Sequence, residues 1–313
     1  MRIGFVIQRY GVEVAGGAEL HCRWVVERLA AHHEVEVITT TAIEYLTWEN
    51  DYPTGMENVN GVPVRRFHVE RKRDEESFQR LSNQVCFHRH PDRDERAWVE
   101  EHGPVAPQLT DYLRAHHGDY DALVFFCYRY WTSFHGITIA PAKSILVPTA
   151  EHDRAIHLRI FKRFFSIPAR ILYNSPEEKK LIHDISATPP AQGPVVGVGI
   201  SLERKVDTEV MRTRLDLLGD YIIYVGRIER EKGCLRLIDF FLRYIGEVNP
   251  TLNLVLAGKS ALTIEEHVNI IPMGVVTEDE KFAAVAAARA LIMPSPYESL
   301  SMVLLEAWLM KRP

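Results

Sequence analysis

The stretch PSPYESLSMVLLEAW, residues 294–308, contains two glutamates eight positions apart, Glu298 and Glu306. Glu298 lies in a polar segment, whereas Glu306 lies among apolar residues that favour a helix. A carboxylate in apolar surroundings is costly unless it is paired, so Glu306 requires a partner. In dinucleotide-binding folds, an acidic residue accepts hydrogen bonds from the ribose hydroxyl groups. If a diphosphate lies at the start of this helix, Glu306 could accept hydrogen bonds from both hydroxyl groups of a ribose.

Ser299 and Ser301 are suitable N-cap residues for the helix that contains Glu306. The N–H groups of the first turn of a helix have no partner within the helix, and they bind phosphate readily. We therefore expect the segment Ser299, Leu300 and Ser301 to contact the phosphates of a ligand, while Glu306 holds its ribose.

The segment YVGRIEREKG, residues 224–233, places Arg227 and Lys232 between an expected strand and an expected helix. Ligands of open α/β sheets bind at the carboxyl ends of the strands, and two cations there could hold a diphosphate. The alternative is a solvated basic loop balanced by Glu229 and Glu231.

Two glycines, Gly16 and Gly17, follow the first expected strand and precede a helix. Glycine lets a ligand approach the backbone closely at such a helix start, which favours a phosphate contact. The alternative is a tight turn without a ligand.

His152 and Asp153 follow the expected strand SILVP in the segment PTAEHDRAI. This position at the carboxyl end of a strand favours a functional role for His152. The alternative is a histidine that lies on the surface or packs in a core, as we expect for His157.

The charged region between residues 70 and 101 has two interpretations, a metal site or a solvated helix and loop. Asp92-Arg93-Asp94 mimics the DxD signature of metal-dependent sugar transferases, and His88 and His90 lie nearby. Proline and interleaved arginines suit a solvated helix and loop better. We therefore expect no metal and no cofactor.

Short apolar runs alternate with segments of helical periodicity along the whole chain, which predicts α/β domains with mostly parallel strands. The expected strands begin at residues 2, 34, 63, 122, 144, 170, 220, 253, 268 and 290, and the expected helices span residues 18–32, 97–116, 176–185, 233–245 and 278–288. The stretch SATPPAQGPVVGVGIS is rich in proline, glycine and small residues, as domain boundaries are. We predict two doubly wound, Rossmann-like domains over residues 1–200 and 201–313.

The composition excludes several classes of protein. A net charge of −5 argues against a nucleic-acid binder. Four widely spaced cysteines indicate neither a zinc ribbon nor a disulfide framework and favour a reducing cytoplasm. No apolar run is long enough to span a membrane. The basic aromatic stretch RAIHLRIFKRFF from Arg154 could lie on the inner face of the membrane, although packing in a core with exposed arginines is favoured.

Together these residues resemble the retaining glycosyltransferases of the GT-B fold, family 4, over nearly the whole chain. The resemblance rests on the ExxxxxxxE pair and on VGRIEREKG. It implies that Arg227 and Lys232 clasp the diphosphate of a nucleotide-sugar donor, that Glu306 holds the ribose and that Glu298 lies by the donor sugar. It also implies that His152 lies near the reacting centre and that Gly16 and Gly17 face the same pocket from the acceptor-side domain.

The implied activity is transfer of a sugar, with retention, to a carbohydrate or lipid-linked acceptor, as in the synthesis of cell-surface polysaccharide or glycolipid. The chain departs from the family at ESLSM, where glycines usually stand, and its family members continue beyond the position of Pro313. We therefore expect a fragment whose second domain is incomplete. The alternative function is a non-catalytic protein that binds sugar nucleotides or carbohydrate. An oxidoreductase is disfavoured because GVEVAGG lacks GxGxxG spacing.

Overall fold

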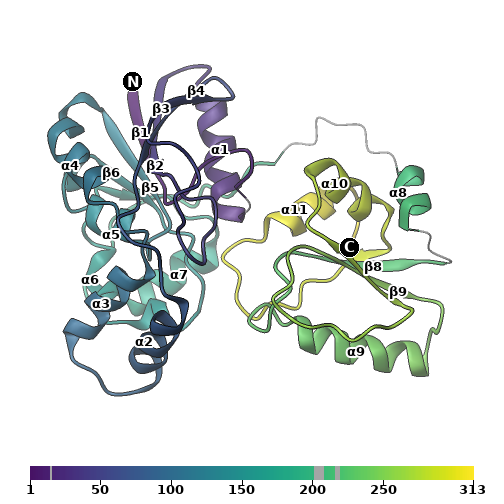
Figure 1. Cartoon of the computed structure of the whole chain (residues 1–313). Coiled ribbons are helices and arrows are strands. Elements are labelled where there is room, and N and C mark those ends of the chain that lie inside the picture. The colour runs from purple at the N-terminus through teal and green to yellow at the C-terminus, as the bar shows by residue number, and fades with distance from the viewer. Residues whose placement is uncertain (15, 201–207, 216–218) are drawn as a thin grey trace. The chain divides into compact units, whose positions relative to one another are not determined.

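The computed structural model describes residues 1–14, 16–200, 208–215 and 219–313. The chain divides into two units, Met1–Val198 and Gly199–Pro313 (Figure 1). The predicted junction near residue 200 adjoins residues 201–207, which lie outside the described part of the chain. Each unit is a mostly parallel sheet covered by helices, so the predicted α/β fold class is confirmed.

The sheet of the N-terminal unit has seven strands in the order β3-β4-β2-β1-β5-β6-β7. They are β1 (Arg2–Val6), β2 (Glu34–Thr40), β3 (Gly55–Val59), β4 (Val62–Phe67), β5 (Ala122–Phe126), β6 (Ser144–Val147) and β7 (Arg170–Ile171). Every neighbouring pair is parallel except β3 and β4. The sequence pattern does not predict β3 because this edge strand is mostly exposed and lacks apolar alternation.

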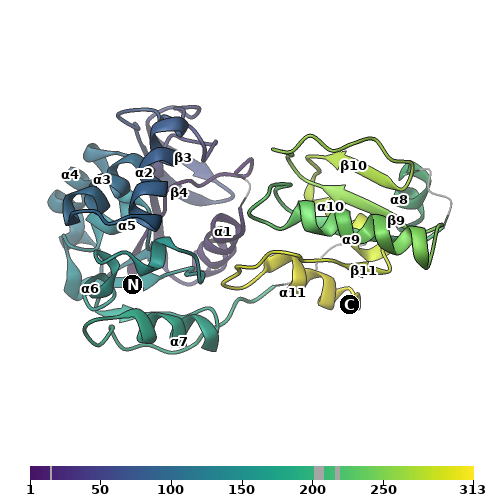
Figure 2. The same ribbon diagram turned by 90° about the horizontal axis from the view of Figure 1, so that it is seen from below.

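Helices cover both faces of this sheet. They are α1 (Gly17–Leu29), α2 (Glu75–Phe87), α3 (Asp92–His102), α4 (Pro107–His116), α5 (Trp131–Gly136), α6 (Phe161–Phe164) and α7 (Pro176–Ile185). α1 packs on one face, and α2 to α7 contribute to the core on the other (Figure 2). The prediction of one helix over residues 97–116 is wrong. α3 ends at His102, its C-cap residue Gly103 has a φ of 66°, and Pro104 cannot continue the helix.

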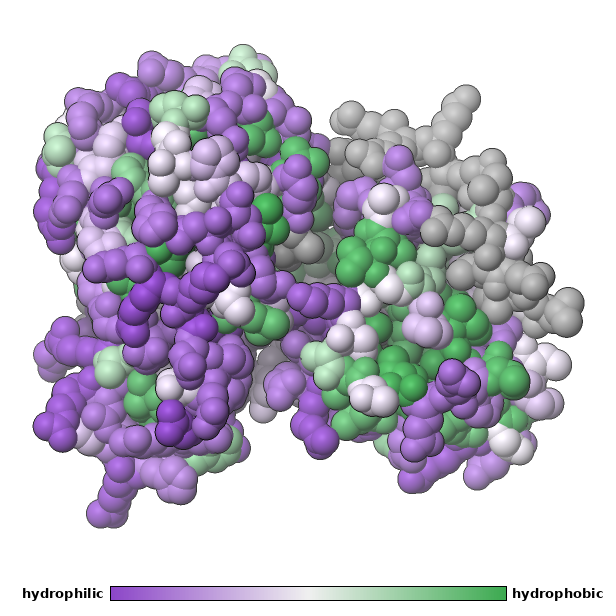
Figure 3. Space-filling view, viewed as in Figure 1, coloured by the Kyte–Doolittle hydropathy of each residue, from purple (hydrophilic) through white to green (hydrophobic). Residues whose placement is uncertain are grey.

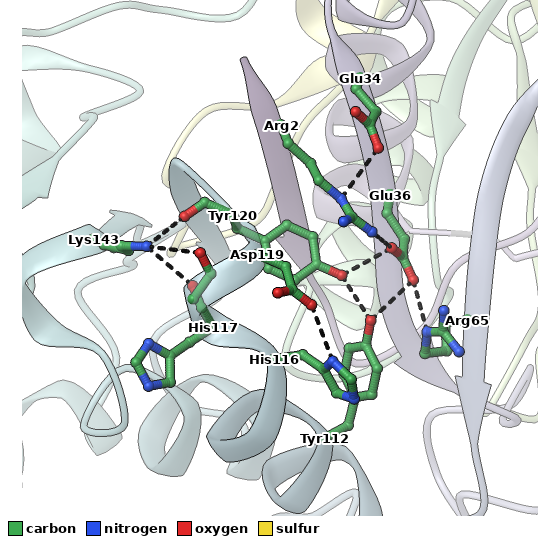
Figure 4. A network of polar contacts seen from close by, with 11 residues as sticks. Arg2, Glu34, Glu36, Arg65, Tyr112, His116, His117, Asp119, Tyr120 and Lys143 are labelled. Atoms are coloured by element: carbon green, nitrogen blue, oxygen red, sulfur yellow. Dashed lines mark hydrogen bonds and ion pairs between the residues drawn. The ribbon is translucent and has the colours of Figure 1, made fainter.

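A polar network fixes the amino ends of β1, β2 and β5 (Figure 4). At its centre, the buried Glu36 pairs with Arg65 at 2.7 Å and accepts a hydrogen bond from the Tyr120 hydroxyl at 2.8 Å. Arg2 joins Glu36 to Glu34. These contacts lie at the edge of the sheet opposite to the carboxyl ends, so we assign them to stability and not to ligand binding.

The sheet of the C-terminal unit is smaller, with four parallel strands in the order β10-β9-β8-β11. The strands are β8 (Tyr221–Val225), β9 (Asn253–Ala257), β10 (Ile270–Gly274) and β11 (Ala290–Leu291), and the helices are α8 (Thr208–Leu215), α9 (Cys234–Glu247), α10 (Glu278–Ala287) and α11 (Met302–Leu309). Side chains alternate along the strands, so that Ile223 and Val255 pack with α8, α10 and α11 while Tyr224 and Leu254 pack with α9.

Both sheets contain a point where the strand order reverses. In the C-terminal unit, the chain runs outward from β8 through β9 to β10 and then returns to place β11 on the other side of β8. In the N-terminal unit, the same reversal lies between β1 and β5. Ligands of doubly wound sheets bind at the carboxyl ends of the strands at such a point, which locates the candidate sites.

Within the described ranges, no helix combines the length and apolar composition needed to cross a bilayer. The basic aromatic stretch that begins at Arg154 packs its aromatic residues inward, since Phe161, Phe164 and Phe165 are buried in the core of the N-terminal unit. The favoured interpretation of this stretch, core packing, is therefore confirmed. On the face shown in Figure 3, hydrophobic residues gather over the C-terminal unit, and its exposed apolar side chains include Phe240 and Tyr244 of α9.

Candidate functional site

Two loops meet at the carboxyl edge of the second sheet, one between β8 and α9 and the other between β11 and α11. Lys232 Nζ of the first loop donates to Glu298 Oε1 of the second at 2.8 Å. Arg236 in α9 donates to the Pro294 carbonyl oxygen at 3.1 Å. The fold therefore brings together two segments that the sequence analysis selected independently.

The Lys232–Glu298 ion pair is only partly shielded, with side chains 20% and 27% exposed. An ion pair with this exposure is worth about 0.2–1 kcal/mol, so a polyanion can displace the carboxylate at little cost. The charge of Lys232 is thus balanced by a residue that the family resemblance places beside the donor sugar.

The loop that contains Arg227 is held in place by contacts with β8 and with the loop before α11. The Tyr224 hydroxyl, on β8, donates to the Arg227 carbonyl oxygen at 2.7 Å. Gly233, the N-cap of α9, adopts a left-handed conformation with a φ of 77°. A Cβ atom there would lie 2.5 Å from the Pro294 carbonyl oxygen, so only glycine lets the two loops approach. The Arg227 side chain is 46% exposed and pairs with Glu229 at 3.0 Å.

α11 begins after Ser301, one of the two predicted N-cap residues, but the expected capping hydrogen bond of the serine side chain is not formed. Ser301 is the N-cap residue, with an extended backbone, yet its side chain makes no capping hydrogen bond. Ser301 is buried, and Ser299 and Leu300 are half-buried in the same segment. The N–H groups of the first turn of α11 thus lack the side-chain cap that a serine usually supplies.

Glu306 lies in the second turn of α11, as predicted, and is 2% exposed. Its partner is Lys281 of α10, whose Nζ lies 2.8 Å from Glu306 Oε1. Lys281 also donates to both carboxylate oxygens of Glu278 at 3.0 Å. Burial raises the pKa of Glu306, and the ammonium group of Lys281 opposes this increase. The cost of the buried carboxylate is therefore offset by a lysine from the neighbouring helix.

In the N-terminal unit, Gly16 is the N-cap of α1 and Gly17 is its first residue. Gly16 has a φ of 153°, and a Cβ atom there would lie 2.1 Å from Glu19 Oε2. The buried Glu19 accepts hydrogen bonds from Gln8 at 2.9 Å and from Arg9 Nε at 3.0 Å. Close packing against Glu19 explains why a glycine is needed at position 16. A ligand contact at Gly16 and Gly17 stays a prediction.

His152 lies in the loop after β6, where its ring centroid is 5.1 Å from that of His157. Both rings line an open depression of about 550 Å³ beside α7. The loop is held on either side of His152, since Glu178 accepts the Ala150 N–H at 2.6 Å and Asp153 pairs with Arg129 at 2.8 Å. In the described residues, no hydrogen bond or ion pair links His152 to Gly16 or Gly17.

The residues considered for a metal site between residues 70 and 101 contact different partners and do not converge on one point. Asp92 pairs with Arg159 at 2.9 Å, His90 bonds to the buried Glu95 at 2.8 Å, and Asp94 accepts from Gln84 at 2.6 Å. In the part of the chain that the structure describes, no group of three or more His, Cys, Asp or Glu side chains is arranged to hold a metal ion. The geometry favours the solvated helix and loop.

Three buried charged residues that support these segments escaped the sequence analysis: Lys281, Glu19 and Glu178. Lys281 is a cation within the alanine-rich segment EDEKFAAVAAA, and the need of Glu306 for a partner is a signal that points to it. Glu178 stands three residues after the N-cap Ser175 of α7, a spacing typical of a capping box. It instead accepts the N–H groups of Ala150 and Asn174.

Several solved structures superpose on almost the whole chain. The sucrose-phosphate synthase of Thermosynechococcus elongatus superposes with a TM-score of 0.70 at 16% identity, covering 100% of this chain and 80% of that one. HepE of Anabaena, in complex with UDP and glucose, gives 0.65 at 15% identity, with 100% and 79% covered. WaaG, a glycosyltransferase involved in lipopolysaccharide biosynthesis, gives 0.63 at 16% identity, with 99% and 80% covered. The chain therefore has the GT-B fold.

Residues 219–313 match the family model of the glycosyl transferases group 1. This matched segment contains Arg227, Lys232, Glu298 and Glu306, and over it the resemblance predicted from the sequence is confirmed. A comparison with curated protein sequences finds no match.

Proposed function

We propose that this protein is a retaining glycosyltransferase that moves a sugar from a nucleotide diphosphate sugar to an acceptor. The observation that carries the proposal is the meeting of Lys232 and Glu298 at the carboxyl edge of the C-terminal sheet, with Arg227 in the same loop. In this proposal the C-terminal unit binds the donor and the N-terminal unit binds the acceptor. Gly16 and Gly17 contribute to the donor site, and His152 takes part in catalysis. The first donor to test is a UDP-sugar, because a solved relative holds UDP.

Charge determines the proposed roles of the donor-site residues. The leaving nucleoside diphosphate gains negative charge as the glycosidic bond breaks. Arg227 and Lys232, together with the N–H groups at the start of α11, stabilise this charge more in the transition state than in the bound donor. These cations take the part that Mg²⁺ plays in DxD enzymes. Glu298 orients the donor sugar after it releases Lys232, and Glu306 holds the ribose.

The acceptor is proposed as a carbohydrate or a lipid-linked sugar, in the synthesis of cell-surface polysaccharide or glycolipid. Support comes from the part that WaaG plays in lipopolysaccharide biosynthesis and from the open depression at His152, whose lining includes the charged side chains of Glu177, Lys180 and Asp184. His152 would lie near the reacting carbon of the donor sugar. The proposed location is the cytoplasm, where nucleotide sugars are available.

Donor turnover tests the proposal. The protein is incubated with the glucose conjugates of UDP, GDP and ADP, with and without a panel of sugar acceptors, and release of the nucleoside diphosphate is measured. We expect release from one donor, its loss in Arg227→Ala and its retention in Glu231→Gln, which removes an exposed charge from the same loop. The anomeric configuration of the product, followed by NMR, tests retention.

A non-catalytic protein that binds sugar nucleotides is the second candidate. It is favoured by Ser299 and Ser301, whose Cβ atoms narrow the approach of a donor where the family usually has glycines. Binding of a nucleotide sugar by the wild type without any release of the diphosphate, including slow release to water, would support this candidate over the enzyme.

A further inference from the structure

The pair formed by Glu306 and Lys281 joins two helices of the C-terminal unit. Glu306 projects from α11, whose first turn is the proposed phosphate contact, and Lys281 projects from α10 on the same face of the sheet. Both side chains are buried, at 2% and 11% exposed. Breaking a buried ion pair costs several kcal/mol, whereas apolar replacement of both members is often neutral. An ion pair that served stability alone could therefore be replaced by two apolar residues, so we ask whether this pair has a role in ligand binding.

The ligand that Glu306 is proposed to bind requires a charged carboxylate. An ionised carboxylate only accepts hydrogen bonds and can take both hydroxyl groups of a ribose, whereas a protonated one loses part of this capacity. Burial opposes ionisation, and so does the carboxylate of Glu278. Lys281 is the cation that opposes both effects.

Lys281 contacts only one of the two carboxylate oxygens of Glu306. Its Nζ donates a hydrogen bond to Oε1, and no hydrogen bond to Oε2 is found among the described residues. Lys281 is itself fixed by two hydrogen bonds from its ammonium group to Glu278, one turn earlier in α10. The position of one carboxylate oxygen is therefore set by Lys281, and the other oxygen is the one that a ribose hydroxyl would have to reach.

We propose that Lys281 is a positioning residue for the nucleotide: it keeps the Glu306 carboxylate ionised and oriented to accept hydrogen bonds from the ribose. This inference rests on the proposed function of the C-terminal unit. It assigns to Lys281 a role in recognising the ribose hydroxyl groups, which a lysine that only stabilises α10 would not have.

The test compares each nucleoside diphosphate with its 2′-deoxy counterpart, using calorimetric titration of UDP and dUDP, GDP and dGDP, and ADP and dADP. Wild-type protein should bind one ribonucleotide about tenfold more tightly than its deoxy form, as expected for one hydrogen bond to a charged acceptor. Lys281→Met should reduce this preference to about twofold or less. Lys311→Met is the matched control, because it makes the same substitution at an exposed lysine that follows α11, and it should retain the preference.

Dependence on pH provides a second readout. In Lys281→Met, Glu306 loses its counter-charge while burial and Glu278 still raise its pKa, so the carboxylate becomes ionised only as the pH rises. The ribose preference of this variant should therefore recover with increasing pH, over a higher pH range than that of the wild type. Lys281→Arg, which keeps the charge, should retain most of the preference. If Lys281→Met does not fold, Lys281→Gln gives the same comparison.

The outcomes separate the inference from the proposed function. A wild-type preference that persists unchanged in a folded Lys281→Met protein would overturn the role of Lys281 and leave the donor site intact. Equal binding of ribo and deoxy forms by the wild type would overturn the role of Glu306 as well. Failure of the wild type to bind any of the six nucleotides would remove the proposed function and the inference with it.

Discussion

Lys232 Nζ donates to Glu298 Oε1 across 2.8 Å, although the two residues are 66 positions apart in the chain. They come from the loops that follow β8 and β11, neighbouring strands at the point where the sheet reverses its order. A residue proposed for the diphosphate is thus neutralised by a residue proposed for the sugar. Binding of a donor must exchange one anion for another at Lys232.

Replacing Glu298 with glutamine should therefore tighten the binding of a free nucleoside diphosphate while it abolishes turnover of the sugar nucleotide. Loss of the competing carboxylate frees Lys232 and removes a negative charge beside the phosphates, which is worth about two- to tenfold in affinity. Calorimetric titration measures the change. Glu231→Gln removes the same charge from an exposed position in the loop and should alter affinity far less. Weaker binding in Glu298→Gln than in Glu231→Gln would contradict the exchange.

Gly233 offers a test of how the two loops are held together. Alanine there must adopt a φ of 77° and place a Cβ atom 2.5 Å from the Pro294 carbonyl oxygen. We expect Gly233→Ala to lower the free energy of unfolding by about 1–3 kcal/mol and to weaken nucleotide binding.

Gly246 is the matched control, since it lies near the other end of α9 and a Cβ atom there would meet no neighbour. Gly246→Ala should stabilise the protein by up to about 1 kcal/mol, because alanine favours the helix and restricts the unfolded chain. Urea unfolding of the whole protein measures the change in the free energy of unfolding for each of the two variants. Equal effects of the two substitutions would show that the conformation at Gly233 is not required.

Glu178 should make the stability of the N-terminal unit dependent on pH. Burial raises its pKa from 4.5 to about 7, although it accepts the N–H groups of Ala150 and Asn174. Because the folded state then binds the proton more tightly than the unfolded state, the contribution of Glu178 is greatest below pH 4.5 and declines as the pH rises through 7. The change is on the order of 3 kcal/mol.

Unfolding of the wild type and of Glu178→Gln, measured by denaturant titration between about pH 5 and 8, isolates this contribution. As the pH rises from 5 to about 7, the wild type should lose stability relative to Glu178→Gln, and the difference between the two proteins should level off above pH 7. A difference that is independent of pH would mean that Glu178 has the same affinity for protons in the folded and unfolded chains.

Local patterns predicted the strands and the main helices of the C-terminal unit, because strands such as β8 and β9 are buried on both faces and contain continuous apolar runs. The errors occur where tertiary contacts decide the outcome. The exposed edge strand β3 is held by its partner β4, and the helical pattern of α3 and α4 is interrupted at Gly103 and Pro104.

Spacing and residue type identified Lys232, Glu298 and Glu306 as site candidates, but not the residues that orient them. The partner of Glu306 comes from α10, 25 positions earlier in the chain, and no local pattern specifies which residue of that helix faces α11. The same holds for Glu178, which reaches the loop of His152 from α7. Such contacts depend on how helices pack against a sheet, which periodicity alone does not determine.

The most direct test of the central claim is a thermal-shift panel of UDP, GDP, ADP and CDP, with and without Mg²⁺, on the wild type and on Arg227→Ala. A ligand at 100 times its dissociation constant stabilises a protein by about 2.7 kcal/mol, which raises the melting temperature measurably. The proposed donor site predicts that one nucleotide stabilises the wild type without Mg²⁺ and that Arg227→Ala, whose half-exposed side chain contributes little to folding, loses most of the shift. No shift with any of the four nucleotides, or an equal shift in Arg227→Ala, would contradict it.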